Sequence, residues 1–276
     1  MLQISNIIQP PDDILKALKD FQDEIDKLLT FDAKRKAAKD LFKSKNKKGN
    51  TVFDAIKVTL KVLCPGIERC VYCEDSQCDE VEHFHPKDLY PQFCFKWANY
   101  FYACGICNGP KNNQFAIFRS DNGRFHKVNP KNGKQSVNEP PTGDSVLINP
   151  RIDNPLDFCR LDLKTFKFTI IASEGTKDYA RADYTYNTVL RLNDQRESLR
   201  RQREVAYSNY KSRLHSYSTS KVNNAEQNRL NTMILNLKRE SHPTVWKEMQ
   251  RQFEMNILSD DELIELFQQS PEALGW

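Results

Sequence analysis

Apolar side chains near the start of the chain recur at the spacing of an α-helix. Successive members of the set are four, three, four and three residues apart, so they share one helix face. They are Ile14, Leu18, Phe21, Ile25 and Leu28. Asp12 or Asp13, directly after a Pro-Pro pair, can cap the first turn. The pattern therefore predicts an amphipathic helix near the N-terminus.

A lysine-rich polar stretch, residues 43–50, separates this helix from a second one. Thr51 can cap the second helix. Its apolar face consists of Val52, Ile56, Leu60 and Leu63. Pro65-Gly66 ends it, because proline lacks the N–H that a helix needs. The first 65 residues are therefore predicted to be a helical pair that leads into a cysteine-rich centre.

The rest of the chain predicts a loop, two short strands and several helices. Residues 119–145 are rich in Asn, Gly, Pro, Lys and Asp, which is typical of a long loop. Segments 145–150 and 165–172 are apolar or alternating and indicate strands. A charged helical pattern follows over 178–217, and two amphipathic helices are expected near the C-terminal end.

Together these patterns predict an α+β protein that is mostly α-helical. The expected segments are an N-terminal helical segment at 1–65, a cysteine-containing core with its following loop and strands at 66–175, and a C-terminal helical region at 176–276. A chain of 276 residues fits one large domain or two small ones. With 39% hydrophobic and 28% charged residues, it can bury a core.

Nothing in the sequence indicates a membrane span or export. No run of 18 apolar residues occurs, and the first residues lack the basic start and apolar stretch of a secretory signal. We therefore expect a cytoplasmic location, where thiols stay reduced. In that setting the eight cysteines are better explained by a metal than by disulfides.

The net charge of +4 matters less than its distribution. Residues 34–48 carry eight Lys or Arg against one Asp, and residues 191–203 carry five Arg. Such stretches can attract a phosphate backbone. Each could instead be the solvated face of a helix, and the sequence leaves both interpretations open.

Two Cys-x2-Cys pairs carry the clearest chemical signal. Cys70 and Cys73 form the first pair, and Cys104 and Cys107 form the second after thirty intervening residues. Two such pairs predict a closed, structural zinc site of four thiolates. A thioredoxin-like redox pair would need only one Cys-x2-Cys beside a βαβ unit. The other four cysteines are expected to be small core residues: Cys64, Cys78, Cys94 and Cys159. Of these, Cys78 lies close enough in sequence to compete for the metal.

The segment between the pairs resembles the HNH endonuclease motif, a small ββα-metal core that is often held together by the same zinc site. "EHFHP" matches the acid–histidine pair of its first strand, "WAN" the middle asparagine, and "CNGPK" the third position on a short helix. The order, the spacing and the interleaving with the cysteines match together. "EH" by itself would not be specific.

The resemblance implies a role for each matched residue. His83 would be the general base that takes a proton from the water that attacks a phosphodiester. Glu82 and Asn108 would offer oxygens to one divalent ion, Mg²⁺ or Mn²⁺. Asn99 would fix the loop that orients the histidine.

Two features leave the geometry open. Neighbours in a regular strand point to opposite faces, so Glu82 and His83 can serve one site only if the strand ends or twists there. His85 shares the strand face of His83 and is a candidate auxiliary ligand or phosphate contact. Lys87 and Lys111 flank the motif, where each could touch phosphate or simply be solvated.

A longer pattern narrows the resemblance. "LINPRIDNP" and then "YTYNTVLRLNDQRESLRRQR" follow the motif. Over roughly residues 50–215 this succession is similar to the PtuB-like HNH nucleases of Septu-type and retron-associated antiphage systems. The resemblance implies a bacterial nuclease with a PtuA-like ATPase partner and a DNA or RNA target. In retron systems it also implies a complex of reverse transcriptase and nucleic acid.

Two other functions fit the same residues. A non-catalytic zinc ribbon could bind nucleic acid or a protein partner, with His83 and His85 in structural roles. A restriction-type HNH nuclease would need elements that read base sequence, and no recognition helix with base-reading side chains is evident.

Overall fold

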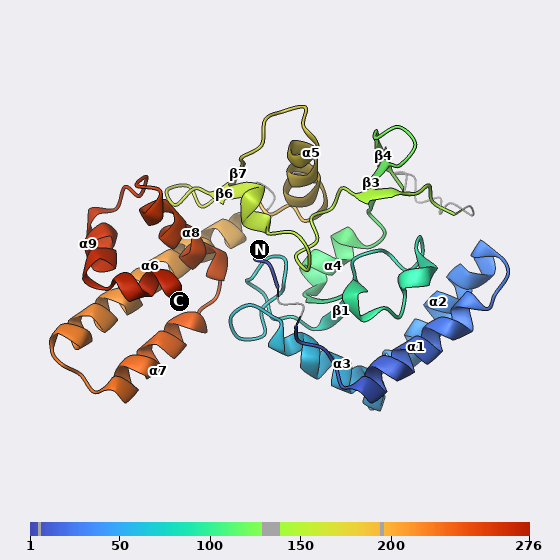
Figure 1. Cartoon of the computed structure of the whole chain (residues 1–276), viewed down its shortest axis with the longest axis horizontal. Coiled ribbons are helices and arrows are strands. Elements are labelled where there is room, and N and C mark those ends of the chain that lie inside the picture. The colour runs from blue at the N-terminus through green and yellow to red at the C-terminus, as the bar shows by residue number, and fades with distance from the viewer. Residues whose placement is uncertain (5–6, 129–138, 194–195) are drawn as a thin grey trace.

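The computed structural model describes residues 1–4, 7–128, 139–193 and 196–276. About half of the chain is helical, and the strands in these residues form small antiparallel sheets (Figure 1). The predicted α+β class is therefore confirmed.

The helices are α1 (Asp12–Asp26), α2 (Phe31–Lys45), α3 (Thr51–Val62), α4 (Gly105–Lys111), α5 (Lys177–Asp183), α6 (Glu197–Val222), α7 (Gln227–Lys238), α8 (Pro243–Glu254) and α9 (Asp261–Gln269). The strands are β1 (Glu80–His83), β2 (Tyr100–Ala103), β3 (Ala116–Arg119), β4 (Phe125–Lys127), β5 (Gly143–Ser145), β6 (Cys159–Leu161) and β7 (Phe168–Ile170). The short 3₁₀ segments are η1 (Pro91–Phe93), η2 (Trp97–Asn99), η3 (Pro155–Asp157) and η5 (Pro271–Gly275), and η4 (Tyr184–Val189) is a π-helix.

The N-terminal segment contains α1, α2 and α3 where the sequence predicted a pair. The first break comes before the polar stretch at 43–50 that was expected to cause it. Thr30 explains the break, because its side-chain oxygen accepts a hydrogen bond from the Ala33 amide at 3.3 Å and caps α2. Asn50, rather than Thr51, caps α3 in the same way.

The cysteine-rich centre is a strand–strand–helix unit. β1 pairs with β2 in an antiparallel hairpin that sets Glu82 opposite Phe101 and His83 opposite Tyr100. α4 follows β2 directly and packs on β1. α4 is short, and Pro110 lies inside it near its end.

Both faces of the hairpin are buried, each in a different hydrophobic cluster. Val81, Tyr100 and Tyr102 belong to a cluster with α1, α2 and α3, which we call the N-terminal cluster. Phe101 and Ala103 belong to the main cluster, which also contains residues of α6, α8 and α9. In Figure 1, α1–α3 lie on one side of the centre and α6–α9 gather at the opposite end of the molecule. The hairpin therefore lies between the two helical regions.

Part of the predicted long loop is a sheet. β3 lies between β4 and β5, and both pairings are antiparallel. Segment 145–150 contributes only Ser145 to a strand, while the apolar residues that follow it are buried. The strand predicted at 165–172 is present as β7, which pairs with β6. Residues 129–138 of the predicted loop lie outside the described residues.

The C-terminal region is held together by aromatic side chains. Tyr210 of α6 stacks on Trp246 of α8 with ring centroids 5.4 Å apart, and Trp246 meets Phe267 of α9 at 5.5 Å. The main cluster includes residues from all three expected segments, and the N-terminal cluster crosses the boundary at 65. The three-segment division itself stays a prediction. Within the described ranges, no helix has the length and apolar character to cross a membrane.

Gly143→Ala should destabilise the pairing of β3 with β5. A Cβ at this position would overlap the carbonyl oxygen of Phe118 on the paired strand, so the two strands would have to separate. We expect urea denaturation to show a loss of about 1–3 kcal/mol in unfolding free energy, the usual cost of overpacking. Gly109→Ala in α4 is the control, because nothing lies within 4 Å of its added Cβ. Equal losses in the two variants would contradict the prediction.

Candidate functional site

The four predicted zinc cysteines converge on one point. The Sγ atoms of Cys70, Cys73, Cys104 and Cys107 all lie within 4.8 Å of one another, and all four residues are buried. Among the described residues, no other group of His, Cys, Asp or Glu is close enough to hold an ion with three or more ligands. The four thiols could therefore bind one metal such as zinc, which prefers tetrahedral sulfur ligands.

An arginine from the C-terminal region reaches this cysteine group. Arg196, just before α6, donates a hydrogen bond to Cys107 Sγ at 3.2 Å. Four thiolates around a divalent ion carry a net negative charge, which a guanidinium offsets. Arg203 of the same arginine-rich stretch is also buried, and it donates to the carbonyl oxygens of Phe166 and Leu192. At least these two arginines of the 191–203 stretch form hydrogen bonds to atoms inside the protein rather than facing a phosphate backbone.

Glu82 lies in a buried network on one face of β1. Its Oε1 forms an ion pair with Lys111, and its Oε2 accepts a hydrogen bond from the Tyr72 hydroxyl at 2.6 Å. Lys111 Nζ also donates to the carbonyl oxygens of His83 and Phe84, at 2.7 Å and 3.1 Å. Burial lowers the pKa of Lys111, while the adjacent carboxylate opposes that effect. Lys111 is therefore an internal link between α4 and the end of β1, not a solvated lysine beside the motif.

His83 points to the opposite face, into an aromatic pocket. Its Nε2 lies 3.0 Å from the Cys94 carbonyl oxygen. The centroid of its ring lies 4.5 Å from that of Phe42 and 5.2 Å from that of Tyr100. Burial holds its pKa well below the usual range, helped by the charge of Lys87. The imidazole is therefore neutral at pH 7. Because a carbonyl can only accept, Nε2 carries the proton and Nδ1 keeps the lone pair.

Asn99 ties together the loop that follows β1. Its Oδ1 accepts from the His85 amide at 2.7 Å and lies 3.2 Å from His85 Nδ1. Its Nδ2 donates to the carbonyl oxygens of His85 and Phe93, at 3.1 Å and 2.9 Å. This single side chain therefore fixes both ends of the segment from His85 to Phe93.

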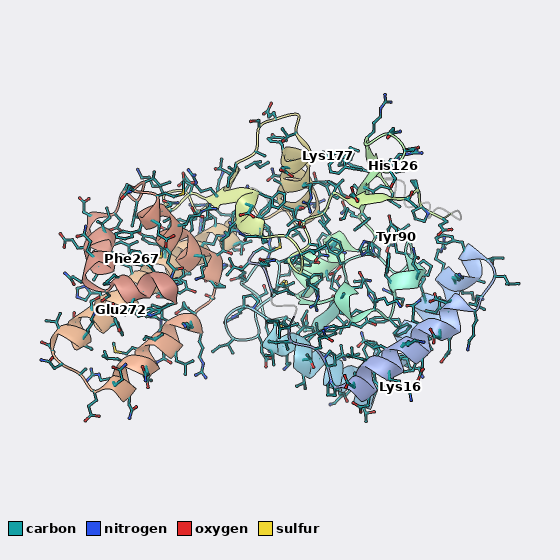
Figure 2. The ribbon with its side chains drawn as sticks, in the orientation of Figure 1. Lys16, Tyr90, His126, Lys177, Phe267 and Glu272 are labelled. Atoms are coloured by element: carbon teal, nitrogen blue, oxygen red, sulfur yellow. The ribbon has the colours of Figure 1, made fainter. Side chains whose placement is uncertain are left out.

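His85 is the histidine of the motif that borders open space. It lines a cleft of about 510 Å³ with Phe118, Asp144 and the α5 side chains Lys177 and Arg181. It also lines a second cleft of about 250 Å³. Figure 2 labels Lys177 of the first cleft and Tyr90 of the second. Burial lowers the pKa of His85 to about 4, so it too is neutral at pH 7.

Asn108 is not bonded to Glu82. Its Nδ2 donates to Glu80 Oε2 at 2.6 Å, near the start of β1. Both oxygens of Glu82 are already engaged by Lys111 and Tyr72. In this arrangement the two proposed ligands do not fit a shared divalent ion. Glu80 and Tyr72 were not expected at the site, although the i, i+2 spacing of Glu80 and Glu82 places both on one strand face.

Comparison with known proteins gives one partial match. Over 68 residues the chain is 41% identical to the Septu protein PtuB of Bacillus thuringiensis. The aligned part covers 23% of this chain and 26% of that protein, so the chain spans about a quarter of the curated relative it matches. No family model and no solved structure matches the chain.

Cys107→Ser should remove the bound metal and weaken the fold. Loss of one thiolate breaks the tetrahedral set that joins the two Cys-x2-Cys pairs. We expect metal analysis to find about one zinc per wild-type chain and far less in the variant, with a lower melting temperature. Cys159→Ser is the matched control, since Cys159 is buried but lies outside the cysteine group. An unchanged zinc content in Cys107→Ser would contradict the assignment of these four cysteines as the zinc ligands.

Lys111→Met should destabilise the protein by about 3–5 kcal/mol, because it leaves the Glu82 carboxylate buried without its partner. Adding Glu82→Gln should recover part of that loss, so the two substitutions will be non-additive in a double-mutant cycle. Urea denaturation measures all three variants. Lys19→Met, at the exposed ion pair with Asp23, should change stability by less than about 0.5 kcal/mol. Additive effects of Lys111→Met and Glu82→Gln would exclude the coupling.

Proposed function

We propose that this chain is a PtuB-like nuclease that hydrolyses phosphodiester bonds in antiphage defence. The observation that carries the proposal is the hairpin–helix unit closed by four cysteines, with a neutral histidine at the end of its first strand. The partial match to Septu PtuB supports the defence role. The bacterial cytoplasmic location, a PtuA-like ATPase partner, a DNA or RNA target and, in retron systems, a reverse transcriptase–nucleic acid complex belong to the same proposal.

His83 is the proposed general base. Its bond to the Cys94 carbonyl fixes the ring and leaves the Nδ1 lone pair as the acceptor for a proton from water. Its lowered pKa keeps the ring unprotonated at pH 7, at the expense of basicity. Asn99 is the proposed positioning residue, because its bonds to His85 and Phe93 fix the loop against which His83 lies.

Access to His83 requires movement in the N-terminal cluster. Only 6% of the residue is exposed, and Phe42 of α2 packs against its ring. A substrate could reach the ring only after Phe42 or the other side chains packed on it move. His85 needs no such movement, because it already lines the cleft that carries Lys177 and Arg181. His85 is therefore the second candidate for the base or for a phosphate contact, and Lys87, next to Phe42, remains a candidate phosphate contact.

Magnesium or manganese is part of the proposal through the resemblance alone. Glu82 could bind an ion only if the Lys111 ammonium left its carboxylate, and Asn108 would have to leave Glu80. We derive no reaction step through a divalent ion from this arrangement.

A specific observation favours a second function, a non-catalytic zinc module. Glu82 and His83 are both buried and both bonded to internal partners, which is what structural residues would show. Such a module would bind a protein or a nucleic acid through its exposed surface without cleaving it.

The two functions are separated by a cleavage assay. The chain is co-expressed and co-purified with the proposed PtuA-like ATPase and incubated with end-labelled DNA or RNA, with Mg²⁺ or Mn²⁺. We expect His83→Ala to lower the cleavage rate by about 100-fold or more, the usual contribution of a general base. His126→Ala, on β4, is the control and should leave the rate unchanged. Zinc content and melting temperature are measured for every variant.

The outcomes are distinct. Loss in His85→Ala with a normal rate in His83→Ala would move the role of base to His85. Wild-type rates in both variants would remove the proposed base. No cleavage by the wild-type complex under any of these conditions would favour the binding module.

A further inference from the structure

Two cysteines outside the zinc group lie against each other. Cys64 Sγ and Cys78 Sγ are 3.2 Å apart, although fourteen positions separate the residues in the chain. Cys64 lies just beyond the C-terminal end of α3, and Cys78 lies just before β1. The sequence predicted small core residues at both positions, with Cys78 as a competitor for the metal. The structure instead brings Cys78 next to Cys64.

The surroundings of the pair do not suit a metal. Within the part of the chain that the structure describes, no third His, Cys, Asp or Glu completes an ion-binding group around these two sulfurs. The polar atoms bonded to the sulfurs are the carbonyl oxygens of Leu60 and Glu68, 3.3 Å from Cys64 Sγ and 3.0 Å from Cys78 Sγ. The carboxylate of Glu68 is nearby as well, but it is paired with Lys61. Cys78 is buried, whereas Cys64 is only partly buried, so a reagent from solvent can reach the pair through Cys64.

We propose that Cys64 and Cys78 are a reversible disulfide site that links the end of α3 to the start of β1. A disulfide bond is about 2.05 Å long, so the sulfurs need to approach by only roughly 1 Å. The backbone around Cys78 is held in place, because its amide donates to the Glu68 carbonyl at 3.0 Å and Arg69 pairs with Gln77 in an isolated β-bridge. The two cysteines therefore meet without rearrangement of the connecting segment.

Formation of this disulfide requires an electron acceptor, and a small disulfide such as oxidised glutathione can act as one. The Cys64 thiolate attacks one sulfur of the oxidant, and one glutathione thiolate leaves. The Cys78 thiolate then attacks Cys64 in this mixed disulfide and displaces the second glutathione. The protein loses two electrons and two protons, and one oxidised glutathione becomes two reduced ones.

The contact between the two sulfurs changes the pKa values of the two thiols in opposite directions. The contact with Cys64 lowers the pKa of Cys78, while the same contact raises the pKa of Cys64. Deprotonation of the pair is therefore favoured at Cys78, which supplies the thiolate for the second, resolving step, whereas the raised pKa of Cys64 slows its first attack on the oxidant. The modification does not depend on the proposed hydrolysis.

The bond would fix the N-terminal helices on the hairpin. Phe53 of α3 packs against Phe42 of α2, and Phe42 covers His83. A covalent link from α3 to the residue before β1 would therefore restrain the helix against which the side chain that covers His83 is packed.

Peptide mapping of the full-length, zinc-loaded protein tests the proposal. The protein is treated with oxidised or reduced glutathione, free thiols are alkylated, and the chain is cut with trypsin and a Glu-specific protease without reduction. These cuts separate Cys64 in peptide 62–68, Cys70 and Cys73 in peptide 70–74, and Cys78 in peptide 75–80. Zinc per chain is measured before and after oxidation.

We expect oxidation to join peptides 62–68 and 75–80 with zinc retained, to lower the intact mass by two hydrogen atoms, and to raise the urea midpoint of unfolding. Dithiothreitol should reverse all three effects. Cys64→Ser should show none of them, and Cys159→Ser should behave as wild type. No link under oxidised glutathione, a link from Cys64 to peptide 70–74, or a link that forms only with loss of zinc would each overturn the proposal.

Discussion

Adjacent side chains of a β-strand point to opposite faces, and in the β1–β2 hairpin both faces are buried. This constraint sends Glu82 and His83 in different directions. Glu82 enters a charged network with Lys111 and Tyr72, whereas His83 enters an aromatic pocket with Phe42. The hairpin thereby contacts the N-terminal helices with one face and the rest of the protein with the other. The remaining structure is organised around these two contacts.

Three cationic side chains join the segments around the hairpin, and each donates to an internal partner: Lys111, Arg196 and Arg151. Lys111 links α4 to the end of β1 through one carboxylate and two carbonyl groups. Arg196 reaches the cysteine group from the start of α6, and Arg151 donates to the Tyr100 carbonyl of β2 at 2.9 Å. A buried charge without such partners would be costly, so these links specify which segments pack together. They also explain why a basic residue in the sequence is not by itself a phosphate contact.

The same burial bears on function. A histidine that stays neutral at pH 7 is suited to accept a proton, yet burial both lowers the pKa of His83 and covers it with α2. The proposed catalysis at His83 therefore depends on movement in the N-terminal cluster. His85, held by Asn99 beside an open cleft, offers the chemistry of a neutral imidazole without that requirement.

The sequence by itself determined what depends on local spacing. Two Cys-x2-Cys pairs defined the four-cysteine group, and the order of the motif matched a strand–strand–helix unit. Apolar periodicity predicted α1 and α3, but not the break that makes α2 a separate helix. Tertiary structure alone decided which side chains meet. It paired Glu82 with Lys111, turned Asn108 to Glu80, and set Cys78 beside Cys64. Spacing fixes the face on which a side chain lies, but its partner comes from a segment distant in sequence, and only packing of the whole chain brings that segment into place.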